Sequence, residues 1–235
     1  MKTLGDDSYL VRAVTFDAVG TLIEPWPSVG HVYSAAAAAC GFGGLEPELL
    51  SRRFHEIWKQ QRLFDFSRRA WFQVVQSCFE GLLDTAELNR VFPVLYERFG
   101  RGSAWRIPPD VLPCLEVLKA REIRMGVVSN FDERLGGILG ELRLARFFDV
   151  VLVSGPLGMN KPDPAIFERA CRLLMIPPGE AVHIGDRVDK DVDGAKRAGM
   201  KAVLVDRRGC ASIGVVPSVR FLGEILELKG FRFGR

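Results

Sequence analysis

The chain has 235 residues, of which 48% are hydrophobic and 26% charged, and its formal net charge is +3. Apolar content near one half, with both signs of charge mixed, is typical of a soluble globular protein, and the length suits either one domain or a core with an insertion. The net charge is too small, and Lys and Arg are too scattered, to predict binding to nucleic acid or to a membrane surface.

The five cysteines predict neither a disulfide framework nor a zinc site, because their number is odd and no two form a CxxC pair. Most are expected to be small core residues: Cys40, Cys78, Cys114, Cys171 and Cys210. Asp6 and Asp7 precede any long apolar run, which does not fit a secretory signal. The uncharged stretch 29–45 is too short and too rich in Ala and Gly for a membrane span. We therefore expect a cytoplasmic protein with reduced thiols.

The first strong element is the apolar run Val14–Phe16, which predicts a strand buried on both faces. It ends at Asp17, and Gly20 then favours a loop. Ligands bind at the carboxyl ends of strands in open α/β sheets, so Asp17 is the first candidate functional residue. The alternative is that Asp17 only begins a turn. Polar residues after three later apolar runs favour the functional interpretation.

A helical insertion is predicted between two stiff linkers. Pro25-Trp26-Pro27 opens it, and the apolar spacing then changes from strand-like runs to helical periodicity. Gly100–Ser103 and Ile107–Asp110 form the second linker. Residues 25–105 are therefore expected to form a helical bundle, inserted into a core made of residues 1–24 and 106–235. Its apolar faces are Leu50, Phe54, Ile57 and Trp58; Phe72, Val75, Phe79 and Leu82; and Leu88, Val91, Phe92, Leu95 and Phe99.

The last of these helices has a plausible N-cap at Asp84 or Thr85, and Pro93 is expected to kink it. Beyond the insertion, predicted strands and helices alternate, which indicates right-handed βαβ crossovers and a parallel sheet. The strands are expected at 125–128, 150–153, 181–184 and 202–205, and the helices at 133–142, 165–174 and 192–198. The predicted fold class is α/β, a Rossmann-like core with an inserted α-helical cap.

The segment Gly185–Asp191 places several charged side chains in a strand-to-helix turn. Asp186 would face Asp17 if their strands are neighbours. Converging carboxylates repel one another unless a cation joins them, and hard oxygen ligands suit Mg²⁺. The alternative, in which Asp189 and Asp191 only cap the next helix, is preferred for Asp189 and not for Asp186.

Two further polar signals follow apolar runs. Ser129 and Asn130 offer a hydroxyl and an amide that suit a phosphoryl oxygen, although each could instead begin a turn or a helix. Lys161 precedes Pro162, which favours an extended loop, and its ammonium would balance nearby carboxylates. Asp163 is expected to cap the helix that Pro164 opens.

These residues resemble the four motifs of the haloacid dehalogenase (HAD)-like hydrolases that carry a helical cap. The motifs are matched by 17–22, Ser129-Asn130, Lys161-Pro162, and Gly185-Asp186 with Asp191, and they cover essentially the whole chain. The runs 127–132 and 161–164 are similar to the branch called HAD-like hydrolase domain-containing proteins.

The resemblance implies a Rossmann-like fold, an aspartyl nucleophile at Asp17 and a magnesium ion. It implies that Ser129 and Asn130 hold the transferred group and that Lys161 steadies the charge. It also implies a metal site made by Asp186, Asp17, the backbone carbonyl of Val19, and Asp191 in or near the first shell. The implied substrate is a small anionic, phosphorylated molecule.

Val19 is the departure from this pattern, because phosphatases of the family carry a second Asp there that protonates the leaving group. Valine cannot transfer a proton, and a positioned acid–base contributes ~10²–10⁴-fold to the rate. Asp132, Glu24 and Asp189 are the nearest substitutes along the chain.

Three functions therefore remain open. The first is a Mg²⁺-dependent phosphohydrolase of low or atypical activity, and the second is a metal-binding regulatory protein without turnover. The third is a 2-haloacid dehalogenase, which the missing second Asp favours and Gly185-Asp186 disfavours. A phosphonatase would need a lysine in the cap, where Lys59 stands alone and is expected to be a solvated surface residue.

Overall fold

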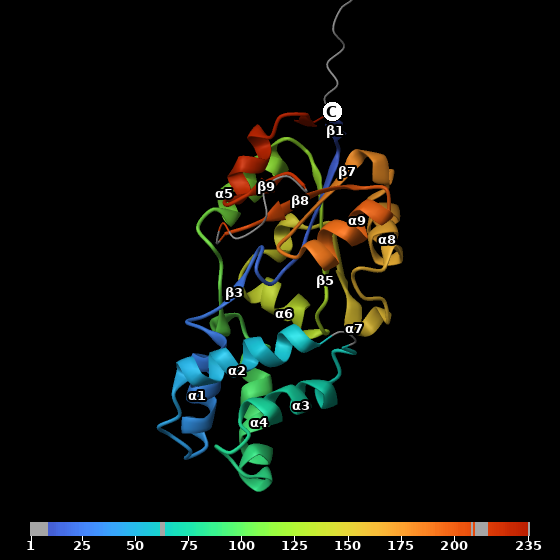
Figure 1. The fold of residues 1–235 in the computed structure, drawn as a ribbon. Helices are drawn as coiled ribbons and strands as arrows, with labels where there is room; N and C mark the ends of the chain where they lie inside the picture. Colours follow the sequence, from blue (N-terminus) through green and yellow to red (C-terminus); the bar gives the residue numbers. More distant parts are fainter. Residues whose placement is uncertain (1–8, 62–63, 208, 210–215, 235) are drawn as a thin grey trace, which may run out of the picture.

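A six-stranded parallel sheet forms the centre of this computed structural model, which describes residues 9–61, 64–207, 209 and 216–234 (Figure 1). Every neighbouring pair in the sheet is parallel, as the alternation of elements predicts. The strand that comes first in the chain, β2, lies inside the sheet, with later strands on both sides. In spatial order the strands are β6 (Val150–Val153), β5 (Arg124–Ser129), β2 (Ala13–Phe16), β7 (Ala181–Gly185), β8 (Lys201–Val205) and β9 (Ser218–Val219).

Two apolar layers cover the sheet, because successive side chains of each strand point to opposite faces. Val14 and Phe16 belong to one cluster, which also holds side chains of α5 (Val111–Ala120) and α6 (Arg134–Glu141). Ala13 belongs to the other, with α8 (Pro164–Leu174) and α9 (Asp193–Arg197). The core is thus a three-layer α/β/α arrangement, and the predicted α/β fold class is confirmed.

Most predicted core elements lie within a residue or two of their expected positions. Asp163 caps α8 through a 2.9 Å hydrogen bond from the Ala165 N–H, as expected. The helix predicted at 192–198 is α9 (Asp193–Arg197), and a π-helical turn, Val188–Val192, that the sequence pattern did not predict precedes it. The sequence pattern did not predict the short helix α7 (Ser154–Leu157) or the parallel pair of β1 (Tyr9–Val11) with β10 (Phe231–Phe233). Short 3₁₀ turns span Gly102–Ala104, Ala145–Phe147, Pro178–Glu180 and Leu222–Glu227.

The helices α1 to α4, which follow β3 (Glu24–Pro25) and precede β4 (Trp105–Arg106), form a separate helical region below the sheet in Figure 1. They share an apolar cluster of their own, which includes Tyr33 stacked on Phe79 with ring centroids 5.6 Å apart. Asp84 begins the last helix with a capping box, and Pro93 lies inside that helix, which continues past it. The helices are α1 (Val29–Ala39), α2 (Pro47–Gln60), α3 (Arg68–Cys78) and α4 (Thr85–Phe99).

The cysteines that the structure describes have free thiols: Cys78, Cys114 and Cys171 are buried, and Cys40 is partly buried. Cys210 lies outside the described residues. Within the described ranges, no helix is both long and apolar enough to cross a membrane.

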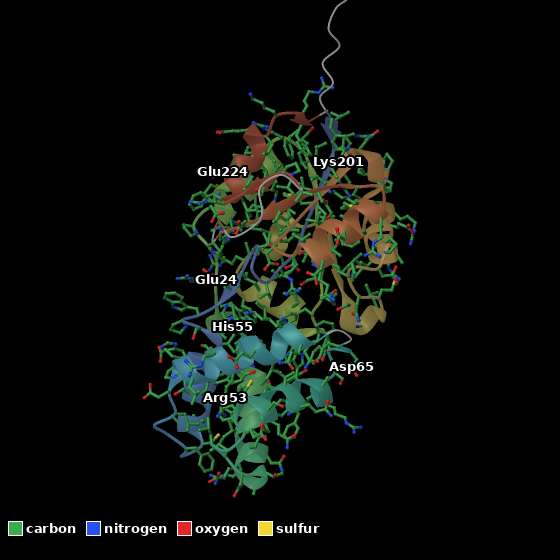
Figure 2. All side chains as sticks on the ribbon, viewed as in Figure 1. Glu24, Arg53, His55, Asp65, Lys201 and Glu224 are labelled. Atoms are coloured by element: carbon green, nitrogen blue, oxygen red, sulfur yellow. The ribbon has the colours of Figure 1, made fainter. Side chains whose placement is uncertain are left out.

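The chain passes between the core and the helical region through two short strands that pair with each other. β3 (Glu24–Pro25) and β4 (Trp105–Arg106) are antiparallel, with Glu24 opposite Arg106. The side chains of these two residues form a 2.6 Å ion pair, and the guanidinium also lies 4.0 Å from the centre of the Trp26 ring. Figure 2 labels Glu24 at this junction. The two predicted linkers are therefore held side by side.

A second contact joins α3 to the loop after β5. The indole Nε1 of Trp71 donates to Asp132 Oδ2 at 2.8 Å, and Asp132 has no exposed surface. Arg134 binds both oxygens of the same carboxylate, at 2.8 and 2.7 Å, and its guanidinium lies 3.6 Å from the centre of the Tyr96 ring in α4. One buried carboxylate therefore connects the helical region to the loop that follows Ser129, the last residue of β5.

Replacing Trp71 with Phe should loosen α3 from the core, because the aromatic packing stays while the donor to Asp132 is lost. A hydrogen bond to a charged group contributes ~1.5–3 kcal/mol, so exchange of the α3 backbone amides should accelerate by roughly tenfold or more. Hydrogen-exchange mass spectrometry measures this. Trp58→Phe is the matched control, because Trp58 stacks on Trp71 with centroids 5.3 Å apart. Equal acceleration in both variants would contradict the role of the hydrogen bond.

Candidate active site

The candidate site lies at the carboxyl ends of the central strands. Asp17 follows β2 directly, its N–H donates to the Ile184 carbonyl of β7 at 2.9 Å, and 7% of its surface is exposed. Ser129 ends β5 on one side of β2, and Asp186 follows β7 on the other. The chain passes from β2 to β5 on one side and later from β6 to β7 on the other side of β2, and ligands bind at such a switch point of the strand order.

Lys161 links the acidic residues of the site. Its Nζ donates to Asp17 Oδ1 at 2.7 Å and to Asp191 Oδ1 at 2.5 Å, and only 2% of the residue is exposed. Ser129 Oγ donates to the same oxygen of Asp17 at 3.1 Å. The side-chain hydrogen bonds that the structure shows to the Asp17 carboxylate thus fall on Oδ1.

Asn130 contacts the backbone of Lys161. Its Oδ1 accepts from the Lys161 N–H at 2.7 Å, and its Nδ2 donates to the Lys161 carbonyl at 2.9 Å. This reciprocal pair fixes the loop before Pro162, whereas the motif predicted an amide that holds the transferred group. Asn130 thus holds the backbone of Lys161 in place, and a part of Asn130 in holding the transferred group stays a prediction.

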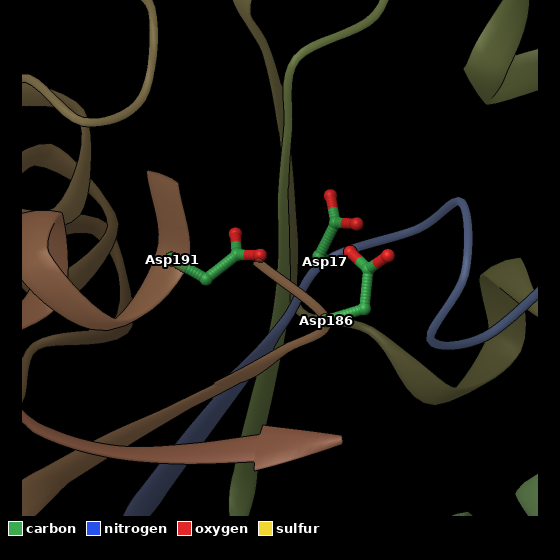
Figure 3. Close-up of side chains that lie close together, drawn as sticks. All are labelled: Asp17, Asp186 and Asp191. Atoms are coloured by element: carbon green, nitrogen blue, oxygen red, sulfur yellow. The ribbon is translucent and has the colours of Figure 1, made fainter. Parts of the chain in front are cut away.

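Three carboxylates converge beside this lysine (Figure 3). One oxygen from each of Asp17, Asp186 and Asp191 can be chosen so that all three lie within 4.8 Å of one another. If all three are ionised, Lys161 balances only one of their charges. A divalent cation with hard oxygen ligands would balance the other two, so the donor set fits Mg²⁺.

The pKa values of these groups reflect burial and crowding. Burial raises the pKa of Asp186 to about 8, and the charges of Asp17 and Asp191 add to the shift. Burial also raises the pKa of Asp17, although Lys161 opposes it. For Asp191, burial is outweighed by Lys161 and His183, which hold its pKa below the ordinary value. The pKa of Lys161 is raised because its two carboxylate partners outweigh its burial.

The loop after Asp17 approaches Asp186 closely. Gly20 has a φ of 91°, and a Cβ at this position would lie 2.5 Å from Asp186 Oδ2, so a larger residue would clash. Val19, the preceding residue, is partly buried and packs against the apolar cluster that contains Phe16. The backbone beside Val19 therefore lies next to a candidate metal ligand, while its side chain offers only methyl groups.

The substitutes considered for the missing acid are all engaged in ion pairs. Asp132 is bound by Arg134 and Trp71, and Glu24 by Arg106. Asp189 receives the Arg187 guanidinium at 3.0 Å through both oxygens. The expectation that Asp189 caps the following helix is wrong, because this ion pair uses its carboxylate and the turn has no side-chain cap.

A buried polar pair behind the site was not anticipated. His183 in β7 is fully buried and has two hydrogen-bond partners. These partners are Thr15 Oγ1 at 2.8 Å and Asp191 Oδ1 at 3.2 Å, so the histidine is connected to the site. Burial lowers the pKa of its imidazole. The alternation of β2 and β7 places Thr15 and His183 on one face, but their register is not visible in the sequence.

The fold and the cluster define an α/β protein with a carboxylate, a lysine and a candidate cation site at the switch point of its sheet. The chain belongs to the haloacid dehalogenase-like hydrolase family, whose sequence model matches residues 11–199. The resemblance of its motifs to this family is thereby confirmed.

The chain is similar in sequence to proteins that are named for different activities. The human haloacid dehalogenase-like hydrolase domain-containing protein 3 is 34% identical over 207 residues, which cover 83% of this chain and 82% of the relative. Glyceraldehyde 3-phosphate phosphatase of Methanopyrus kandleri is 43% identical over 211 residues, 85% of each chain. The solved structure of 2-haloacid dehalogenase from Pseudomonas syringae is 27% identical, with a TM-score of 0.63, and the match covers 93% of this chain and 97% of that one.

The raised pKa of Asp186 makes the metal-free protein sensitive to alkaline pH. The carboxyl ionises near 3.8 in the unfolded chain and near 8 in the folded one. Its contribution to stability is therefore complete below pH 3.8 and is lost as the pH rises through 8. In EDTA, Asp186→Asn should melt above wild type, by a margin that grows from pH 5 to pH 8.

Thermal melts of both proteins across this range measure the margin. Adding Mg²⁺ at pH 8 is the control, because it should raise the melting temperature of wild type and not that of the variant. A margin that stays constant from pH 5 to pH 8 would contradict the assignment of this titration to Asp186.

Proposed function

We propose that this protein is a Mg²⁺-dependent phosphohydrolase that uses Asp17 as its nucleophile, and that Val19 makes its activity low or atypical. The observation that carries the proposal is the buried cluster in which Lys161 forms ion pairs with Asp17 and Asp191, beside Asp186. The similarity to glyceraldehyde 3-phosphate phosphatase supports a small phosphorylated substrate. Residues 25–105 are proposed to be the cap, and 1–24 with 106–235 the core.

Each residue has a role in this proposal. An Asp17 oxygen attacks the phosphorus, so that a bond forms between them while the bond to the leaving oxygen breaks. Ser129 and Lys161 donate hydrogen bonds to Asp17 Oδ1, which orients the carboxylate and places two donors beside the incoming oxyanion. Water then hydrolyses the aspartyl phosphate, which releases phosphate and restores the carboxylate.

Mg²⁺ would be held by Asp17 and Asp186 directly, with the Val19 carbonyl beside them and Asp191 in or near the first shell. When bound, it would neutralise charge on the nucleophile and on the phosphoryl oxygens. Asp191 has less free capacity than the other two, because Lys161 and His183 bind its Oδ1 and the Arg187 N–H binds its Oδ2. Its larger part is to fix Lys161.

Among the described residues, none of the candidates considered is free to donate a proton to the leaving oxygen. Val19 cannot supply a proton, and Asp132, Glu24 and Asp189 are held by arginines. A leaving group that is stable as an anion needs no protonation, so the site as built favours aryl or acyl phosphates over alkyl ones.

Hydrolysis of an aryl phosphate should depend on both Mg²⁺ and Asp17. Wild type should show weak turnover with Mg²⁺ that EDTA abolishes, and Asp17→Asn should reduce it to background, because the amide oxygen is a poor nucleophile. Release of nitrophenol measures the rate. Turnover retained in a well-folded Asp17→Asn protein would contradict the proposal. Chloride release from a 2-haloacid without metal would indicate a dehalogenase instead, and Mg²⁺ binding without turnover a regulatory protein.

Restoring the missing acid should raise the rate. Val19→Asp would place a carboxyl two residues after the nucleophile, and turnover of an alkyl phosphate should increase by roughly 10²-fold or more. Val19→Asn is the matched control, because its amide has nearly the same shape and cannot transfer the proton. Melting curves with Mg²⁺ check that both variants fold. Equal rates in the Asp and Asn variants would show that the acid is not what limits turnover.

A further inference from the structure

His183 stands directly behind the candidate metal site, in the middle of β7. It is fully buried on the face of the sheet covered by α8, where the edge of the Phe167 ring packs on the imidazole with centroids 4.9 Å apart. Thr15, its neighbour in register on β2, is also fully buried. This polar pair interrupts a layer that is otherwise made mostly of Ala, Val, Leu and Ile side chains.

The two hydrogen bonds of the imidazole determine which nitrogen carries the proton. An ionised carboxylate only accepts, so Nε2 must donate to Asp191 Oδ1, 3.2 Å away. A neutral imidazole then offers Nδ1 as an acceptor, and the Thr15 hydroxyl donates to it at 2.8 Å. Asp191 therefore fixes the tautomer, and the Thr15 hydroxyl satisfies the nitrogen that this tautomer leaves as an acceptor.

Asp191 is constrained on every side by these contacts. Its Oδ1 receives Lys161 and His183, and its Oδ2 receives the Arg187 N–H at 2.9 Å. Gly185 lies against the same carboxylate so closely that any Cβ there would clash with it. The carboxylate thus has one available orientation, and Lys161 follows it toward Asp17.

Burying two polar side chains in an apolar layer is unfavourable unless both are hydrogen-bonded. An aliphatic pair of similar size would fill this space without that requirement, so packing alone does not account for Thr15 and His183. What the polar pair adds is a directed N–H toward Asp191.

We propose that His183 is a positioning residue, which orients Asp191 and through it Lys161, and that Thr15 supports it by hydrogen-bonding the buried Nδ1 and holding the imidazole in place. The inference rests on the proposed function, because it concerns the residues that would hold Mg²⁺ and orient the nucleophile. Residues that orient metal-site ligands in this way change metal affinity by ~10–100-fold when they are removed.

The test is the affinity of the purified protein for Mg²⁺, measured by titration calorimetry. His183→Leu should weaken binding by ~10–100-fold. His183→Gln should recover most of the loss, because its amide N–H can reach the place of Nε2–H. Val182→Ala is the control, because this buried neighbour packs in the opposite layer, so its loss should lower the melting temperature without changing Mg²⁺ affinity.

Thr15 gives a second pair of variants, which decides the question if His183→Leu does not fold. Thr15→Val keeps the shape and loses the hydroxyl, so it should weaken Mg²⁺ binding, whereas Thr15→Ser keeps the hydroxyl and should bind nearly as wild type does. Equal affinity in the Val and Ser variants would overturn the supporting role of Thr15 and with it the proposal.

The remaining outcomes separate this inference from the proposed function. If wild type binds Mg²⁺ and His183→Leu binds it equally well, the positioning role is wrong while the proposed function stands. A loss in Val182→Ala as large as that in His183→Leu would also overturn the role, since it would reflect general destabilisation. Absence of Mg²⁺ binding by wild type would overturn both.

Discussion

The site depends on one buried ammonium group. Lys161 is the only cation that directly contacts the carboxylates of Asp17 and Asp191 among the described residues, and burial makes each of these charges costly without it. The surrounding contacts serve to keep this group in place: Asn130 clamps its backbone, and His183 and Arg187 fix the carboxylate it binds. The carboxylates that Lys161 does not balance are the donor set that fits a divalent cation.

The sheet brings these residues together because it is parallel and its first strand is central. Ser129 ends β5, and Asp17 and Asp186 directly follow β2 and β7. These three strands are neighbours, so the strand order places the residues together at the carboxyl end of the sheet. The helical region reaches the same edge through Trp71 and Asp132, which lies three residues beyond Ser129. This hydrogen bond connects α3 to the segment that directly follows Ser129 at the end of β5.

Sequence reasoning predicted those parts of the structure that local pattern determines. The alternation of apolar runs predicted the parallel core, and Asp17 and Asp186 were recognisable because each follows such a run and precedes a loop. Partners far apart in the chain were not predictable in this way. The Asn130 amide reaches Lys161, and the His183 imidazole reaches Thr15, only because of loop geometry and strand register. Asp189 was misassigned because Arg187, two residues away, competes for its carboxylate.

The antiparallel pair β3–β4 has a consequence for how such chains diversify. The core chain stops at Glu24 and resumes at Arg106, and these two residues are hydrogen-bonded neighbours. The segment between them is an insertion whose two ends are adjacent. Its length and its number of helices can therefore vary without displacing a strand of the sheet. Genetic exchange at this ribbon would place a different helical region on an unchanged sheet, and the Glu24–Arg106 pair marks where the two would join.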